Sequence, residues 1–262
     1  MRELFELRGS LSTKKSILLG ISGGILVLLF WFYAWNFGLV RRAILPSPAE
    51  VFYSFPDLFQ EDHLVSNVSY SVFLNFLGYL EAVLIALPLG LVVGLIPSVR
   101  KIAEPYISAL RYTPLSATLG LFISAFGLGS NMKIQFLTLG LLVYLVPQTV
   151  SRVDEVEEVY VQTVRTLGAS KWQTITSVFI PAVVSRVFGD IRVLLGISWT
   201  YIIMAEIINM SDGGIGALAY KAARQSRPDK VYAVLMVIMI IGFLQDKISG
   251  GLDRLLFRYK YA

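Results

Sequence analysis

The sequence predicts an all-α protein that is integral to a membrane and crosses it six times. Its 262 residues are 55% hydrophobic and only 16% charged, whereas soluble domains average about 25% charge. Long stretches without a charged residue recur along the chain, and about 20 apolar residues suffice to span a bilayer as a helix. The chain has no cysteine and one histidine, His63, which excludes disulfides and metal sites built from thiolates or histidine clusters.

Six spans are expected, at about residues 17–38, 68–96, 104–126, 133–151, 190–209 and 230–250. The first carries no charge and is too long for the apolar core of a cleavable signal peptide. The second and fifth are of spanning length although each carries an acid, Glu81 and Glu206. The third and fourth draw on the charge-free stretches 112–132 and 134–151. The sixth has a shorter apolar part, 231–245, and extends into the polar tail.

The distribution of positive charge predicts the orientation in the membrane. With both termini placed in the cytoplasm, the cytoplasmic segments carry about twice as many Lys and Arg residues as the external ones. Arg41 and Arg42, directly after the first span, oppose this trend. Because cytoplasmic loops of membrane proteins are rich in Lys and Arg, the net charge of +5 does not indicate a nucleic-acid partner. We expect a multi-pass protein with one transmembrane domain over residues 1–262.

The longest cytoplasmic segment, residues 152–186, is too polar to cross the bilayer and is patterned like two helices. Apolar residues recur at helical spacing over 153–167 and again over 172–179. Between the two runs lies Gly168–Ser170, where the glycine allows a sharp turn and the serine can cap the next helix. The pattern predicts two short helices joined by a tight turn, lying across the membrane face.

This segment resembles the hallmark of the permease subunits of type I ATP-binding cassette (ABC) importers. Their hallmark is Glu-Ala-Ala, three residues, Gly, nine residues, and Ile-x-Leu-Pro. Here Gln162-Thr163-Val164 holds the first three positions and Gly168 and Pro181 fall in register, whereas the acid and both alanines are replaced. The resemblance implies that a short surface helix binds in a groove of a soluble ATPase. The residues implied in ATPase coupling are Gln162, Arg165, Gly168, Ala169, Ser170, Lys171, Trp172 and Pro181.

Further short motifs narrow the resemblance to permeases of the nitrate, sulfonate, taurine and bicarbonate group. They follow the order of that group over nearly the whole chain: Leu45–Val51, Leu110–Pro114, Phe126–Gly129, Ala205–Glu206, Gly213–Gly216 and Asp246. Tyr112 replaces a proline of the group, Ser130 an acid, and Glu81 a residue that is usually apolar. These differences leave the transported solute open.

The resemblance also implies an assembly. The expected fold is that of type I ABC importer permeases, as a homodimer with the translocation path at its interface. Two ABC ATPase subunits would bind ATP and Mg on the cytoplasmic side, so this chain itself is expected to be neither an enzyme nor cofactor-dependent. A substrate-binding protein would deliver a small anionic solute from outside, and the lipid of a bacterial inner membrane would surround the spans.

Polar and aromatic residues of the spans are candidates for the translocation path: Glu81, Arg111, Thr113, Ser116, Trp199, Thr200, Tyr201 and Glu206. A carboxylate in mid-span such as Glu81 is costly to bury, so it serves transport or pairs with a cation, for example Arg111 or Arg192. Glu206 lies near the outer end of its span, which favours a gate or a tie between spans over a proton relay.

Arg111 stands beside Thr113 and Ser116, and an arginine with hydroxyl neighbours suits an anion. The alternative is an arginine that reaches the lipid phosphates from the end of its span. Trp199 and Tyr201 suit either a cavity wall or a packed core.

Basic residues recur every three positions in the last external segment, at Lys221, Arg224, Arg227 and Lys230. On one helix this spacing places the charges on one side. We expect that side, above all Lys221, Arg224 and Arg227, to dock an acidic surface of the binding protein. A solvated face without a partner is the alternative.

A secondary transporter or channel that works without an ATPase is the main alternative function. Six spans are few for most secondary transporters, and no inverted repeat is visible in the sequence. A membrane-embedded enzyme is a second alternative, but Glu81 and Glu206 have no His or Cys residue beside them in the sequence.

Overall fold

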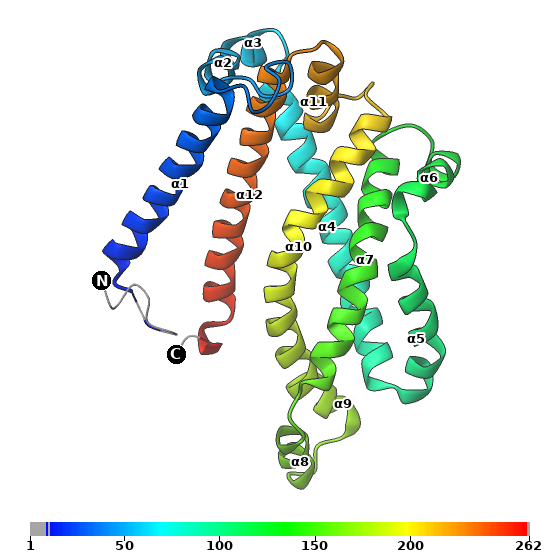
Figure 1. The fold of residues 1–262 in the computed structure, drawn as a ribbon. Helices are drawn as coiled ribbons and strands as arrows, with labels where there is room; N and C mark the ends of the chain where they lie inside the picture. Colours follow the sequence, from blue (N-terminus) through cyan, green and yellow to red (C-terminus); the bar gives the residue numbers. More distant parts are fainter. Residues whose placement is uncertain (1–8, 10, 261–262) are drawn as a thin grey trace.

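The computed structural model describes residue 9 and residues 11–260, and the regular structure of these residues is helical. Long helices run side by side, and short helices cover both ends of the bundle (Figure 1). At one end, the α11 end, lie α2 (Pro48–Tyr53), α3 (Phe55–Gln60) and α11 (Ile215–Arg224). At the other, the α8 end, lie α8 (Glu158–Thr166) and α9 (Lys171–Thr174). The all-α prediction is confirmed.

Five helical stretches in the described residues are long and apolar enough to cross a membrane. Four are α1 (Thr13–Asn36), α4 (Leu64–Leu95), α7 (Ser130–Asp154) and α12 (Pro228–Leu256). The fifth runs from Lys171 to Ile208 and joins α9 to α10 (Ile180–Ile208) through a π-helical turn. α1 begins and α12 ends at the α8 end, so the first and last spans leave the bundle on the side of α8 and α9 (Figure 1).

The expected third span differs from the prediction, because it is not one continuous helix. α5 (Pro97–Tyr112) ends at Thr113, and a 3₁₀ turn then leads into α6 (Leu119–Phe126). Pro114 explains the break, since a proline drives the residue before it out of the helical region and lacks the N–H group that a helix needs. Thr113 accordingly has an extended backbone, with φ −81° and ψ 120°. The count of six spans therefore stays a prediction.

α4, α7 and α10 form the packed centre of the bundle. α4 and α7 approach so closely that a Cβ atom at Gly90 would collide with the side chain of Thr149. Small residues permit such contact between spans, where dispersion forces rather than water drive association. In the same interface Leu74, Leu137 and Leu141 are fully or almost fully buried.

α1 lies at the edge of the bundle and packs only near the α11 end. Ala34 is its one buried residue. Trp31 stacks on Tyr232 of α12, with ring centroids 5.8 Å apart, and donates from Nε1 to the carbonyl of Pro46 at 2.9 Å. Towards the α8 end the two helices separate (Figure 1).

Candidate functional site

Residues 155–179, the hairpin segment, connect α7 to α10 and contain α8 and α9. α8 begins at Glu158, later than the apolar pattern predicts, because α7 runs on to Asp154 and a turn follows. Gly168 directly follows the C-cap of α8, and its φ of +83° lies in the left-handed region that favours glycine. The Gly168 N–H donates to the carbonyl of Arg165 at 2.9 Å, and the Ala169 N–H donates to that of Val164 at 3.0 Å. This Schellman arrangement terminates α8.

The second short helix starts as the sequence predicts. Ser170 Oγ accepts from the N–H of Gln173 at 3.3 Å, and the Gln173 side chain accepts from the N–H of Ser170 at 2.8 Å. These reciprocal bonds form a capping box at the start of α9. The predicted helix, glycine turn and serine-capped helix are thus confirmed.

α9 joins α10 through an irregular turn at Ile175–Phe179. The N–H of Ile180 donates to the carbonyl of Ile175, one residue further back than in an α-helix. Pro181 follows at the start of α10, where its missing N–H can be tolerated. A single π turn of this kind is common at functional sites.

The hairpin segment presents large apolar side chains to its surroundings. Leu167 is 81% exposed and Trp172 is 69% exposed, on either side of the Gly168 turn. Of the residues implied in ATPase coupling, Ala169 is half-buried and the others are exposed. Leu167 was not singled out by the sequence, although a large apolar residue directly before a helix-ending glycine is a usable signal.

A groove of about 540 Å³ lies between α8 and the start of α10. It is lined by Tyr160 and Val164 of α8, by Val178 of the π turn and by Pro181 of α10. Tyr259, after α12, also lines it. α8 therefore stands away from α10 along this groove.

An ionic network holds the base of the hairpin segment, and sequence reasoning did not identify it. Arg152, in the last turn of α7, donates to both carboxylate oxygens of Asp190 in α10, at 2.6 and 2.8 Å. Its remaining Nη1 donates to the carboxylate of Glu155 at 2.7 Å. Arg186 of α10 donates to the backbone carbonyl of Glu155 at 2.7 Å. Acids and bases 31 to 38 positions apart carry no local signal in a sequence.

The predicted path residues do not gather in one place. Ser116, Trp199 and Thr200 line a cavity of about 810 Å³ between α10, α12 and the 3₁₀ turn before α6. Its other lining residues are apolar apart from Gly196, namely Leu119, Ile203, Met204, Ile207, Ile208, Leu235 and Ile238. Trp199 also donates from Nε1 to the Gln245 side chain at 2.8 Å. Tyr201 instead packs its ring against Phe136 of α7, with centroids 5.8 Å apart.

Arg111 lies apart from that cavity. It borders a cleft of about 280 Å³ that α5 and α7 form at the α8 end, with Ser108 and Ser151. Thr113 donates its hydroxyl to the backbone carbonyl of Ala109 at 3.3 Å. The expected cluster of Arg111, Thr113 and Ser116 is thus divided, because the Pro114 break turns the chain between them.

The partners of Glu81 are polar side chains of α7 and not the cations suggested from the sequence. Gln135 donates to both of its carboxylate oxygens at 3.0 Å, and Thr138 donates to one at 3.3 Å. Of the suggested partners, Arg192 binds Asp246 of α12 instead, at 2.7 Å. Polar α7 residues, rather than a buried ion pair, therefore compensate the Glu81 carboxylate.

Glu206 is fully buried and joins three helices near the α11 end. Its carboxylate accepts from the hydroxyl of Ser71 in α4 at 2.5 Å and from the N–H of Gly216 in α11 at 2.7 Å. Lys133 of α7, which is also fully buried, lies 3.5 Å from Asp212 in the α10–α11 loop. This geometry places Glu206 in a tie between spans.

The predicted basic side in the last external segment is wrong, because its residues do not share one helix. α11 ends at Arg224, Ser226 has a φ of 57°, and α12 begins at Pro228. Lys221 and Arg224 are exposed on α11. Lys221 Nζ nevertheless lies 3.6 Å from Asp62, and Arg227 and Lys230 also face acids of the α3 region.

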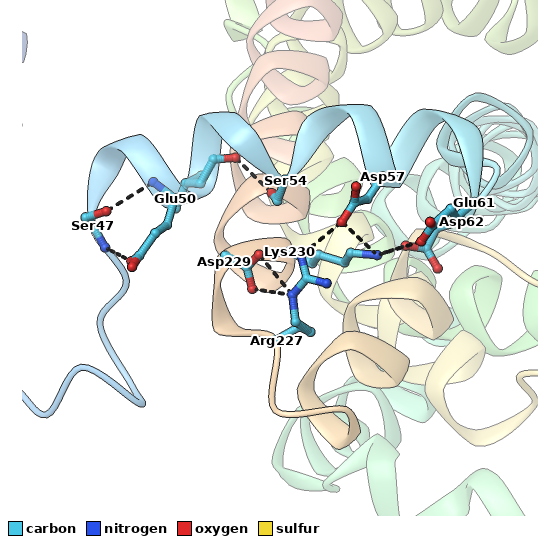
Figure 2. A network of polar contacts seen from close by, with 10 residues as sticks. Ser47, Glu50, Ser54, Asp57, Glu61, Asp62, Arg227, Asp229 and Lys230 are labelled. Atoms are coloured by element: carbon cyan, nitrogen blue, oxygen red, sulfur yellow. Dashed lines mark hydrogen bonds and ion pairs between the residues drawn. The ribbon is translucent and has the colours of Figure 1, made fainter.

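Arg227 and Lys230 are held by acids of the α3 region, and Figure 2 shows both cations pointing at them. Arg227 Nη2 lies 3.1 Å from Asp57 of α3 and 2.7 Å from Asp229. Lys230 Nζ lies 2.5 Å from Asp62 and is almost completely buried. Burial opposes ionisation of Asp62, but the hydrogen bond and charge of Lys230, together with those of Lys221, outweigh it and lower the pKa of Asp62 below its usual 3.8. Arg227 is thus engaged within the chain.

Comparison with known proteins decides what this helical bundle is. Residues 86–258 match the family model described as the inner membrane component of binding-protein-dependent transport systems. The chain belongs to this family. It is a permease subunit of an ABC importer and a multi-pass membrane protein, which answers the alternative of a secondary transporter or channel.

Two relatives illustrate the branch to which this permease is similar. The taurine transport system permease protein TauC of Escherichia coli is 28% identical over 245 residues, covering 92% of this chain and 89% of TauC. The nitrate import permease protein NrtB of Synechococcus elongatus is 25% identical over 182 residues, covering 68% and 65% of the two chains. The resemblance to the nitrate, sulfonate and taurine group is therefore confirmed.

A solved structure agrees with the fold of the permease. A chain of a bacterial alginate ABC transporter, in complex with an alginate-bound periplasmic protein, superposes with a TM-score of 0.65. The match covers 93% of this chain and 96% of the other, at 16% sequence identity. The importer permease fold is thus shared although few residues are.

Proposed function

We propose that this permease imports a small anionic solute as a homodimer driven by two ABC ATPase subunits. The ATPases bind the hairpin segment on the cytoplasmic side, and an external substrate-binding protein delivers the solute. ATP and Mg bind in the ATPases, so this chain supplies the path and no catalytic group. Both termini then lie in the cytoplasm of a bacterial cell, because α1 begins and α12 ends on the side of the hairpin segment.

The exposed apolar tip of the hairpin segment is the observation that carries the proposal. Leu167 and Trp172 flank the Gly168 turn and are largely exposed in the described residues, at 81% and 69%. Large aromatic side chains are the usual centres of binding energy in protein interfaces. Arg165 and Lys171 add positive charge beside this tip. A soluble partner of complementary shape would cover these residues.

The delivery side rests on two smaller observations. Lys221 and Arg224 are exposed on α11, although Lys221 also pairs with Asp62 at 3.6 Å, and they are the part of the predicted basic side that still suits an acidic binding protein. The cavity lined by Ser116, Trp199 and Thr200 supports a path along α10. The relatives named for taurine and nitrate suggest an oxyanion as the solute.

Copurification tests the proposal. The tagged chain, expressed with the ATPase of its own transport system, should bring that ATPase down in mild detergent. Trp172→Ala should weaken the association about 30-fold, because a central interface aromatic contributes about 2 kcal/mol. The control is Tyr53→Ala, an aromatic residue on α2 that is 81% exposed at the opposite end of the bundle. Equal recovery from Trp172→Ala and Tyr53→Ala would place the ATPase elsewhere.

A further inference from the structure

The network at the base of the hairpin segment joins three parts of the chain through one side chain. Every guanidinium nitrogen of Arg152 is engaged: two with Asp190 of α10 and one with Glu155, the first residue of the segment. Such paired donors fix direction as well as distance, which a lysine ammonium does not. Arg186 adds a bond from α10 to the Glu155 carbonyl. α7, α10 and the segment therefore meet in one geometry.

We propose that Arg152, with Glu155, Arg186 and Asp190, is a positioning device that makes the hairpin segment move with α7 and α10 as one body. The inference rests on the proposed function in one respect, namely that an ATPase supplies the force. It assigns a role in coupling to four residues that lie outside the Gln162–Pro181 stretch.

Apolar contacts also hold the hairpin segment, because Val156 and Phe179 pack against the core of the bundle and Val161 of α8 is buried, but such contacts fix direction less strictly than paired hydrogen bonds do. The groove of about 540 Å³ separates α8 from the start of α10. In the described part of the chain, the side-chain hydrogen bonds of α8 and α9 close within the segment itself, as at Thr163, Ser170 and Thr176. Among the described residues, the side-chain hydrogen bonds that join the segment to the spans are those at Glu155, which accepts from Arg152 and from Arg186.

The other connection of the segment is the π turn at Ile175–Phe179, which departs from regular α-helix geometry. If the base were loose, a push on α9 could be absorbed in this turn instead of tilting α10. With Glu155 tied to both Arg152 and Arg186, the segment is held at its start as well as at its end. The Asp190 side chain is only 11% exposed, so solvent screens its bond with Arg152 less than it screens a surface pair.

Pulsed electron paramagnetic resonance can test this directly, because the chain has no cysteine of its own. Spin labels at Glu158→Cys on α8 and Val193→Cys on α10, both exposed positions, report the distance within the proposed body. We expect a narrow distance distribution that stays unchanged when ATP is added to the complex with the ATPase. Arg152→Ala should broaden it, and ATP should then shift its mean.

Matched variants separate the network from a general loss of structure. The exchanged pair Arg152→Asp with Asp190→Arg should restore the narrow distribution, and Asp190→Asn should broaden it with little change of volume. Arg100→Ala is the control, since Arg100 binds Asp154 at 2.7 and 2.8 Å with the same paired donors but does not contact the hairpin base. We expect the control to match the unmodified labelled protein.

The two proposals fail in different ways. If the unmodified chain binds no ATPase, the proposed function is wrong, and the width of the distribution without ATP still decides the role of Arg152. If Arg152→Ala and Asp190→Asn keep the narrow distribution, the positioning role is wrong even when the ATPase binds. Broadening by Arg100→Ala to the same extent would also overturn it.

Discussion

The two ends of the bundle differ in how their helices are held together. At the α11 end, buried charges join helices far apart in the sequence: Glu206 and Lys133 are fully buried and Lys230 nearly so. At the α8 end, the polar contacts concentrate at the base of the hairpin segment, and Leu167 and Trp172 remain exposed. A network without free groups holds helices in one arrangement, whereas exposed apolar side chains suit a surface that binds another molecule. The α11 end is thus held together by buried charges, and the α8 end by polar contacts at the base of an exposed hairpin segment.

The strongest way to break this comparison is to remove the Glu206 carboxylate. Glu206→Ala should lower the free energy of unfolding by about 3 to 5 kcal/mol, because the buried Ser71 hydroxyl and the Gly216 N–H lose their acceptor and the buried Lys133 is left with Asp212 as its counter-charge. Denaturant unfolding in detergent measures the loss. Glu158→Ala, an exposed acid of α8, should stay within about 0.5 kcal/mol of the unmodified protein. Comparable losses from both variants would erase the contrast between the ends.

Two glycines with positive φ, one at each end, allow a second comparison with a smaller expected loss of stability. Gly214 has a φ of 112° and a Cβ there would collide with the Glu206 carboxylate, whereas Gly168 has a φ of 83° and open space around it. Gly214→Ala should lower the thermal midpoint more, with a loss of about 3 kcal/mol from strain and displacement of Glu206. Gly168→Ala should lose only about 1 kcal/mol, from strain alone. The reverse order would contradict the crowding inferred at the α11 end.

Acid should loosen the α11 end through Asp62. Its pKa is lowered in the folded protein, so its ion pair with Lys230 contributes stability that is complete above pH 3.8 and is lost as the pH falls further, through the folded pKa. Hydrogen exchange of the α3 amides should therefore accelerate below pH 3.8. In Lys230→Ala, exchange at α3 should be faster at neutral pH and respond less to acid. An acid response as large as in the unmodified protein would assign the effect to other groups.

Local chemistry explains which predictions from sequence hold. Gly168 must take a positive φ to end α8, and Ser170 caps the next helix with a residue three positions away. The Pro114 break could also have been read from the sequence, because a proline disfavours helix in the residue before it. The prediction missed this break because it treated residues 104–126 as one continuous span.

The sequence alone determined the membrane class, the apolar helices and the turn at Gly168, because these depend on composition and on neighbours within a few residues. Only the tertiary structure decided the partners of the charges. The basic residues spaced every three positions divide between α11 and α12, and Arg227 and Lys230 bind acids about 170 positions earlier in the chain. Arg152 likewise finds Asp190 only once α7 and α10 lie side by side. Helix packing selects such pairs, and it leaves no periodic signal in the sequence.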